Sequence, residues 1–241
     1  MARLLPWLLL AAALLALAVT VWRPDEVAWR LGLGDQLAAR QDSMWERRLR
    51  SHYRRLDGST PAGAVVFLGA SSVQGLNAAA VRSCTASFGI GGETAEQLVE
   101  RIGDYRSIDR AAAVVVMTGL NDVLRGRGAT LEGTYHRLLA ALPADRMVLL
   151  SSMQRLPPGH PLADAVGHAN IAARRACAGR RGCRYVDLQG AMFGRTAVWE
   201  PDGIHLNPAG YALWSQLLRD SLAAAGVAER PCQSYGGRRP R

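Results

Sequence analysis

The sequence predicts a single α/β domain with a parallel, five-stranded sheet, and three observations support this prediction. Short apolar runs alternate with segments of helical periodicity between residues 64 and 225. Such alternation is typical of βαβ units, whose strands are parallel. Residues 111–117 form a continuous apolar run, which indicates a strand buried on both faces. The chain has 241 residues, of which 49% are hydrophobic, so one substantial core is expected.

The predicted elements follow one another in a regular order. A charged helix over residues 36–56 comes first, and it is expected either to pack beside the domain or to act as a stalk. Asn207 and Pro208 mark the start of the last helix as cap and first helical residue. The strands are expected at residues 64–68, 85–88, 111–117, 147–150 and 184–188. The other helices are expected at residues 93–102 and 131–142, within 161–178, and at 208–225.

The N-terminal 23 residues form a separate predicted segment. Residues 4–22 are almost entirely apolar and contain no acidic residue. They fit a signal-anchor helix, because 19 residues in a helix span roughly 30 Å, the thickness of a bilayer core. They also fit a cleaved signal peptide, with Ala16-Leu17-Ala18 as the cleavage pattern. Both interpretations place the following domain outside the cytoplasm, in the periplasm or beyond.

The remaining chain divides into three predicted parts. Residues 24–60 are expected to form a linker and stalk helix, residues 61–228 the folded domain, and residues 229–241 a basic flexible tail. The net charge of +9 comes from arginine alone, since the chain has no lysine. The arginines are scattered and accompany no nucleic-acid-binding motif, so binding to nucleic acid is not expected.

The four cysteines fit an oxidising compartment. Cys177 and Cys183 lie six residues apart and could form a disulfide, which would leave Cys84 to pair with Cys232. Four buried thiols are the alternative, because spacing does not fix connectivity. The cysteine spacing does not match a zinc site, and no metal or organic cofactor is expected.

The candidate site residues lie at the carboxyl ends of the predicted strands, where open α/β sheets place their active sites. Ser71 follows the first strand, Gly89 ends the second, and Asn121 follows the third. Asp202 and His205 lie three residues apart near the end of the chain. Together these residues supply a hydroxyl nucleophile, a base, a carboxylate and hydrogen-bond donors, which are the components of acyl transfer.

Each of these residues has a specific expected role. Ser71 would be the nucleophile and His205 the base, because an imidazole can take up and return a proton at neutral pH. Asp202 would orient the imidazole and stabilise its cation. The N–H groups of Ser71 and Gly89 and the Asn121 side chain would form an oxyanion hole, in which one donor is typically worth roughly 3 kcal/mol. Taken singly, Ser71 could be a helix cap and Gly89 a turn residue, so the prediction depends on the residues occurring together.

These candidate residues lie in four short stretches of sequence. The stretches resemble the four sequence blocks of the SGNH (GDSL) hydrolase superfamily and occur in the same order. The similarity covers residues 62–226 and implies a flavodoxin-like, three-layer α/β/α fold with a five-stranded parallel sheet. One departure is Ala70, which replaces the aspartate that precedes the serine in the family and would help to fix the loop. The matching stretches are Gly69-Ala70-Ser71, residues 87–94, Gly119-Leu120-Asn121-Asp122 and Asp202-Gly203-Ile204-His205.

The resemblance implies a serine hydrolase that cleaves an ester through an acyl-enzyme, with a lipid, an acetylated sugar or a small acyl ester as substrate. The membrane is the other expected partner, through the N-terminal helix. An O-acyl- or acetyltransferase would use the same triad, and a catalytically degenerate binding domain of the cell envelope is a further alternative that Ala70 favours. Loops 125–130, 154–161 and 190–199 are expected to shape the pocket. Candidates for an apolar acyl site are Met153, Met192, Phe193 and Trp199.

Overall fold

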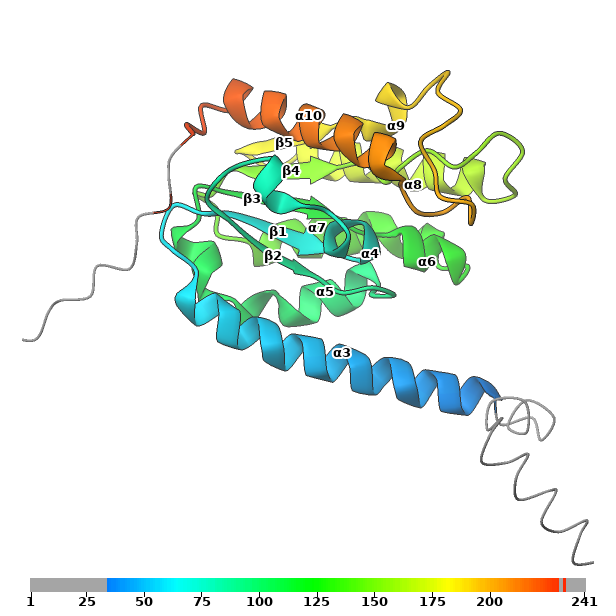
Figure 1. Ribbon diagram of the computed structural model, residues 1–241, viewed down its shortest axis with the longest axis horizontal. Helices are drawn as coiled ribbons and strands as arrows, with labels where there is room; N and C mark the ends of the chain where they lie inside the picture. The colour runs from blue at the N-terminus through cyan, green and yellow to red at the C-terminus, as the bar shows by residue number, and fades with distance from the viewer. Residues whose placement is uncertain (1–33, 230–231, 233–241) are drawn as a thin grey trace, which may run out of the picture. The chain divides into compact units, whose positions relative to one another are not determined.

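A five-stranded parallel sheet lies at the centre of the domain in the computed structural model, which describes residues 34–229 and residue 232 (Figure 1). The strand order is β2-β1-β3-β4-β5, and every neighbouring pair is parallel. The predicted fold class is therefore confirmed. The strands are β1 Val65–Gly69, β2 Thr85–Gly89, β3 Ala113–Met117, β4 Val148–Ser151 and β5 Cys183–Val186.

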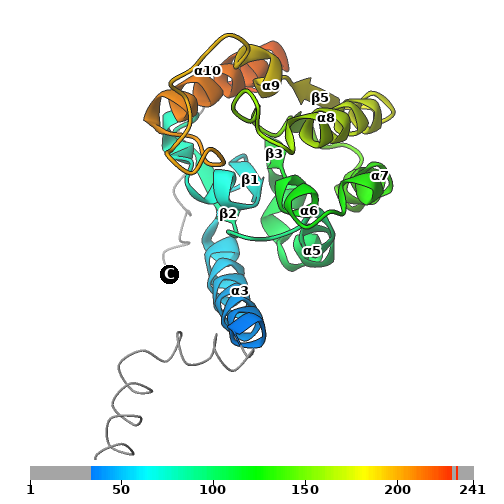
Figure 2. The same cartoon turned by 90° about the vertical axis from the view of Figure 1, so that its right-hand side faces the viewer.

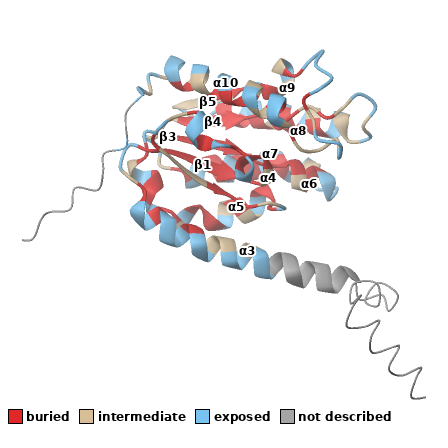
Figure 3. Ribbon diagram, viewed as in Figure 1, coloured by how far each residue is buried: buried red, intermediate tan, exposed pale blue. Residues whose placement is uncertain are grey.

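Helices cover both faces of this sheet and give it three layers (Figure 2). Successive side chains of a strand point to opposite faces, so the apolar residues of β1 divide between two cores. Val66 and Leu68 belong to one core, whereas Val65 and Phe67 pack in the other with Trp214. In Figure 3 the central strands are coloured as buried, between helices that have exposed outer surfaces. The first core is covered by α5 Ala95–Arg101, α6 Leu120–Leu124, α7 Leu131–Ala141 and α8 Ala163–Ala178, and the second by α4 Ser71–Gln74, α9 Leu188–Ala191 and α10 Pro208–Ala224.

The long helix α3, Gly34–Ser59, belongs to the domain from Leu49 onward. In that part Leu49 and Tyr53 pack against the core, and the Tyr53 hydroxyl donates to the Gly89 carbonyl at 2.7 Å. Arg50 pairs with Asp104 at 2.6 Å. The apolar segment predicted at residues 4–22 lies outside the described residues. Among the helices that the structure describes, none has the length and apolar character needed to cross a membrane.

Two disulfides are present, Cys177–Cys183 and Cys84–Cys232, with Cα atoms 5.3 Å and 4.7 Å apart. The second joins the start of β2 to the C-terminal segment. Glu229 reinforces this connection, because its carboxylate accepts the Ser83 N–H at 3.0 Å and pairs with Arg82 at 2.7 Å. The segment predicted as a flexible tail is thus tied to the domain at Glu229 and Cys232. Its other residues lie outside the described part of the chain.

Two glycines allow the turns that follow β1 and β3. Gly69 has a φ of +151°, and a Cβ there would overlap the Met117 carbonyl oxygen of β3. Gly119 has a φ of +110°, and a Cβ there would overlap the Tyr135 hydroxyl. Only glycine adopts such conformations without strain. The close approach of these turns therefore places Ser71 and Asn121 at neighbouring strand ends.

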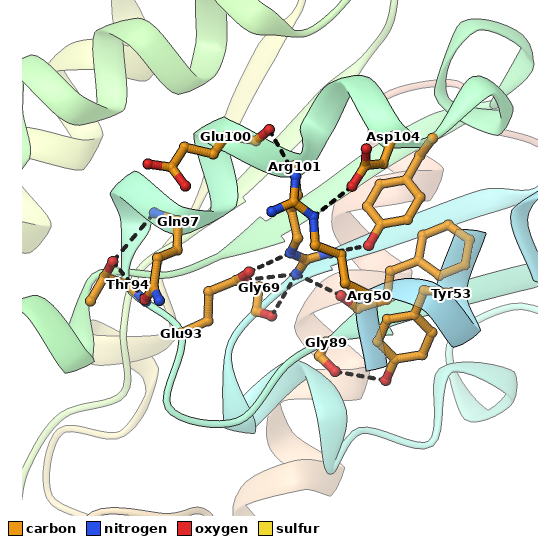
Figure 4. A network of polar contacts seen from close by, with 12 residues as sticks. Arg50, Tyr53, Gly69, Gly89, Glu93, Thr94, Gln97, Glu100, Arg101 and Asp104 are labelled. Carbon is orange, nitrogen blue, oxygen red and sulfur yellow. Dashed lines mark hydrogen bonds and ion pairs between the residues drawn. The ribbon is translucent and has the colours of Figure 1, made fainter. Parts of the chain in front are cut away.

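A buried ion pair joins the ends of β1 and β2 (Figure 4). The side chains of Arg101, from α5, and Glu93, from the turn after β2, are both fully buried. The Arg101 Nη2 group donates to the Glu93 carboxylate and to the Phe88 carbonyl, each at 2.7 Å, and lies 3.4 Å from the Gly69 carbonyl. One guanidinium therefore holds two strand ends and the intervening turn together.

The arginine remains charged in this apolar surrounding. Burial lowers the pKa of Arg101, but the hydrogen bonds that Arg101 donates to Glu93 and the charge of the Glu93 carboxylate more than offset this effect, and the net pKa lies above the ordinary value. The Tyr105 hydroxyl accepts a further bond from Arg101 at 2.6 Å. A buried guanidinium is tolerated only when its donors are satisfied in this way.

We expect Arg101→Met to lower the free energy of unfolding by about 3–5 kcal/mol, because it leaves the Glu93 carboxylate buried without its cation. Urea unfolding followed by circular dichroism would measure the change. The matched control is Arg137→Met, which breaks the exposed pair with Glu96 and should cost less than about 1 kcal/mol. Equal effects of the two substitutions would show that the buried pair does not hold the strand ends.

Candidate active site

The structure brings Ser71, His205 and Asp202 together, although Ser71 and His205 lie 134 residues apart. The His205 Nε2 atom is 3.0 Å from the Ser71 hydroxyl oxygen, and its Nδ1 atom is 2.6 Å from the Asp202 carboxylate. These contacts match the nucleophile, base and orienting carboxylate of a serine hydrolase. Ser71 is partly buried, and the side chains of His205 and Asp202 are 43% and 49% exposed, so a substrate has access to the three residues.

A tight turn before α10 sets the geometry of the aspartate and the histidine. One oxygen of Asp202 accepts the backbone N–H groups of Ile204 and His205, both at 2.9 Å, which leaves its second oxygen for the imidazole. Gly203 has a φ of +67° and allows the chain to reverse. The D-x-x-H stretch thus forms one tight turn, in which the Asp202 carboxylate fixes both the backbone of the turn and the orientation of the His205 ring.

The Asp202 carboxylate is held in its ionised form. Hydrogen bonds from the His205 ring, and then from the backbone N–H groups of His205 and Ile204, lower its pKa from 3.8 to about 2. Hydrogen bonds to a carboxylate favour its charged form. Asp202 therefore remains an acceptor for the imidazole at every pH at which the fold is expected to be stable.

Gln154 connects the turn after β1 with the histidine turn, a role that the sequence did not predict, although Gln154 begins one of the loops expected to shape the pocket. Its side chain is fully buried. The Gln154 Nε2 atom donates to the Ile204 carbonyl at 2.7 Å, and its Oε1 atom accepts the Ser72 hydroxyl at 3.4 Å. The available signal was its position just after the fourth strand, at the same edge of the sheet as the candidate residues.

Asn121 and Asp122 hold the turn between β2 and α5. The Asn121 side-chain amide donates to the Glu93 carbonyl at 2.9 Å, and Asp122 accepts the Ala95 N–H at 2.8 Å. Burial raises the pKa of Asp122, and the bond from Ala95 lowers it in part. An amide nitrogen carries two hydrogens, so Asn121 retains one donor beyond the bond to Glu93.

The structure contradicts the prediction of Gly89 as an oxyanion donor. The Ile90 N–H donates to the Gly69 carbonyl of β1 at 2.9 Å, so the peptide groups of Gly89 face the other side of β2. There the Gly89 carbonyl accepts the Tyr53 hydroxyl. Gly91 lies against the nucleophile instead, since a Cβ at this position would be 3.8 Å from the Ser71 Cβ.

The turn after β2 offers another backbone donor. The Gly91 N–H is taken up by the Gln74 side chain at 2.6 Å, and the Gly92 carbonyl accepts Arg125 at 2.9 Å. The Gly92 N–H has no hydrogen-bond partner within residues 34–229. Gly92 is exposed and lies between Gly91, which faces Ser71, and Glu93, which is bonded to Asn121.

Ala70, which takes the place of the family aspartate, is buried and leaves the geometry intact. Its N–H donates to the Met117 carbonyl at 3.4 Å, and its carbonyl accepts the Gln74 N–H at 3.0 Å. Backbone bonds therefore fix this loop together with the Arg101 contact to Gly69.

Two of the residues considered for an acyl site have other surroundings. Met153 and Met192 are buried in the two cores. Trp199 donates its ring N–H to the Arg155 carbonyl at 2.6 Å, whereas Phe193 is 74% exposed. Across the described residues, no group of histidine, cysteine, aspartate and glutamate side chains could hold a metal ion.

Comparison with solved structures supports the fold. A protein from Streptococcus pneumonia that is named for platelet activating factor matches with a TM-score of 0.71 and 17% identity, over 79% of this chain and 99% of that one. The lipase/acylhydrolase from Enterococcus faecalis matches with a TM-score of 0.61 and 21% identity, over 71% and 99%. The catalytic domain of the peptidoglycan O-acetyltransferase A of Streptococcus pneumoniae matches with a TM-score of 0.59 and 16% identity, over 69% of this chain and 96% of that one.

The family is set by sequence. No curated protein matches the chain. A model of the GDSL-like lipase/acylhydrolase family matches residues 32–213, which is most of the chain and includes all five candidate site residues together with the described sheet. The resemblance that the sequence blocks predicted is thus confirmed. The chain belongs to the GDSL-like lipase/acylhydrolase family, whose members are ester-hydrolysing enzymes.

Proposed function

We propose that the domain is a serine esterase in which Ser71 is the nucleophile, His205 the general base and Asp202 the residue that orients His205. The observation that carries this proposal is the continuous series of contacts from Ser71 through His205 to Asp202, at 3.0 Å and 2.6 Å. Such a series activates a hydroxyl that is otherwise a weak nucleophile at neutral pH.

The reaction proceeds in two halves. The Ser71 oxygen attacks the ester carbonyl carbon while His205 Nε2 takes the hydroxyl proton, and the carbonyl oxygen becomes an oxyanion. His205 then gives this proton to the departing alcohol, and the acyl group remains on Ser71. A water molecule, deprotonated by His205, attacks the acyl-enzyme, and the carboxylic acid leaves as the proton returns to Ser71.

The oxyanion hole is assigned to three donors at neighbouring strand ends. Two are the Ser71 N–H and the remaining amide hydrogen of Asn121. The third is the Gly92 N–H, which replaces Gly89 in this role because it has no other partner in the described chain and lies between Gly91 and Glu93. Fixed donors of this kind stabilise the developing charge without reorganisation.

The domain is proposed to act outside the cytoplasm. Both disulfides are compatible with an oxidising compartment, since thiols in the cytosol are kept reduced. The apolar segment predicted at residues 4–22, as an anchor or a signal peptide, leads to the same location.

An O-acetyltransferase is the second candidate. The triad would serve it equally, because a sugar hydroxyl would replace water in the second half of the reaction. The structural match to a peptidoglycan O-acetyltransferase favours this candidate, and a match to a carbohydrate esterase of Talaromyces cellulolyticus favours hydrolysis. Product analysis with and without an added saccharide acceptor separates the two activities.

We expect a fluorophosphonate probe to label the purified protein on Ser71, and labelling and hydrolysis of p-nitrophenyl acetate to disappear in Ser71→Ala. Intact-mass spectrometry and absorbance would record the two results. Ser83→Ala is a control on an exposed loop residue and should retain both. A protein that resists the probe and hydrolyses the ester no faster than Ser71→Ala would contradict the esterase and favour the catalytically degenerate binding domain.

We expect Asp202→Asn to lower kcat by on the order of 100-fold or more, because an amide cannot hold the imidazole in the required tautomer.

The same substitution tests the lowered pKa of the Asp202 carboxyl. The ionised Asp202 contributes to stability above its ordinary pKa of 3.8, and the contribution is lost as the pH falls to about 2. As the pH falls from 3.8 to about 2, the Tm of the variant should therefore decrease less than the Tm of the unmodified protein. The difference should be small, because the Asp202 carboxylate is half exposed. A parallel loss in both proteins would contradict the depressed pKa.

We expect Gln154→Met to lower kcat about tenfold with little change in KM, because it removes both hydrogen bonds that connect the Ser72 and Ile204 turns. Steady-state kinetics on p-nitrophenyl acetate would measure both parameters. Gln216→Met, on the exposed face of α10, is the control and should behave as the unmodified protein. A change in KM alone would assign Gln154 to substrate binding rather than to positioning.

A further inference from the structure

A cavity of about 780 Å³ opens beside the histidine turn. It lies between the loop that follows β4, the N-terminal half of α8, and α9, within the volume range of roughly 300–1,000 Å³ that is usual for small-molecule sites. Polar side chains from all three elements line it, among them Arg155, Asp164, His168 and Gln189.

The wall of the cavity contacts the turn that holds Asp202 and His205. Pro157 forms part of its wall and packs against Gly203 of the histidine turn, since a Cβ at Gly203 would be 3.5 Å from the Pro157 Cγ. The same loop contains Gln154, which contacts Ser72 and Ile204. A substrate whose ester lies at Ser71 can therefore extend along this loop into the cavity.

Gln189 presents a fixed donor to the cavity. The buried Asn170 donates its amide N–H to Gln189 Oε1 at 2.9 Å, which settles the direction of the Gln189 amide. Its Nε2 atom consequently faces Gly167 on α8, where a Cβ would be 3.6 Å away. Within the described residues this nitrogen has no protein acceptor, so its hydrogens are available to a ligand oxygen.

Arg155 and Phe193 form a stacked pair at the rim of the cavity. Its guanidinium lies 4.9 Å from the centre of the Phe193 ring, and Phe193 is 74% exposed. A large exposed aromatic ring beside a polar cavity is unusual for a side chain that serves only the core. The flat ring and the guanidinium provide a platform for the C–H face of a cyclic ligand.

We propose that this cavity, which we call the Gln189 groove, binds the saccharide part of an ester substrate, so that the enzyme deacylates an O-acylated sugar chain. The proposal rests on the esterase function proposed above. A sugar matches the lining, because its hydroxyls pair with Gln189, Asp164, His168 and Arg155 while its C–H faces contact Pro157 and Ile171. A fatty acyl chain does not match, since it would desolvate charged side chains without pairing them.

The first test compares two esters on the full chain, O-acetylated xylotetraose and p-nitrophenyl acetate. Gly167→Leu fills the groove from a helical position at which a side chain improves helix propensity, so the variant should fold. We expect it to lower kcat/KM at least about tenfold for the acetylated saccharide and to leave p-nitrophenyl acetate unaffected, because the small ester does not reach the groove. Gly133→Leu, at an exposed position of α7, is the matched control.

A second measurement separates the groove from the catalytic proposal. Ser71→Ala cannot turn over ester but retains the groove, so it should bind unacetylated xylotetraose in calorimetry, and Ser71→Ala/Gly167→Leu should not. Binding without turnover in the unmodified protein would refute the esterase and keep the groove. The groove proposal would be overturned if Gly167→Leu lowered the turnover of both esters equally or lowered neither. It would also be overturned if the enzyme preferred p-nitrophenyl octanoate and Gly167→Leu left the turnover of that ester unchanged.

Discussion

The buried pair of Arg101 and Glu93 is the interaction on which the rest of the site depends. A single guanidinium contacts the Gly69 carbonyl before the nucleophile, the Phe88 carbonyl of β2 and the carboxylate of the turn after β2. The turn after β1 and the turn after β2 therefore share one support. This support also explains why the chain tolerates Ala70, since the loop is fixed from beneath by Arg101 and from β3 by the Met117 carbonyl.

A second constraint connects the two ends of the domain. Ser71 follows the first strand and His205 precedes the last helix, and only the folded sheet brings them to hydrogen-bond distance. Gln154, in the loop that follows β4, contacts Ser72 of the first turn and Ile204 of the second. The turns that contain Ser71 and His205 are thus connected through one buried side chain, a common arrangement where rigid elements support functional loops.

The sequence was sufficient for the sheet and for the three residues that the structure brings together. Apolar runs predicted β1, β3 and β4, because burial on both faces leaves a strong compositional signal. The edge strands β2 and β5 are only partly buried and were predicted from their place in the alternation of strands and helices. The pattern D-x-x-H predicted the Asp202–His205 contact, because the interaction is local. Gly89 was wrong as a donor because the direction of a peptide group depends on which side of the edge strand is paired. The role of Arg101 was missed because nothing in the local pattern marks an arginine of α5 as buried, and the role of Gln154 was missed because its contacts to Ser72 and Ile204 join residues distant in sequence. The Gln189 groove exists only once α8 and α9 are packed.

The central claim is that Ser71 carries the acyl group during turnover. The most direct measurement is to quench a reaction with p-nitrophenyl acetate in acid, digest the protein and map the added mass by tandem mass spectrometry. We expect one acetyl group on Ser71, with none on the neighbouring Ser72 and none in His205→Ala. Hydrolysis that proceeds with Ser71 unmodified, or an acetyl group found on Ser72, would contradict it.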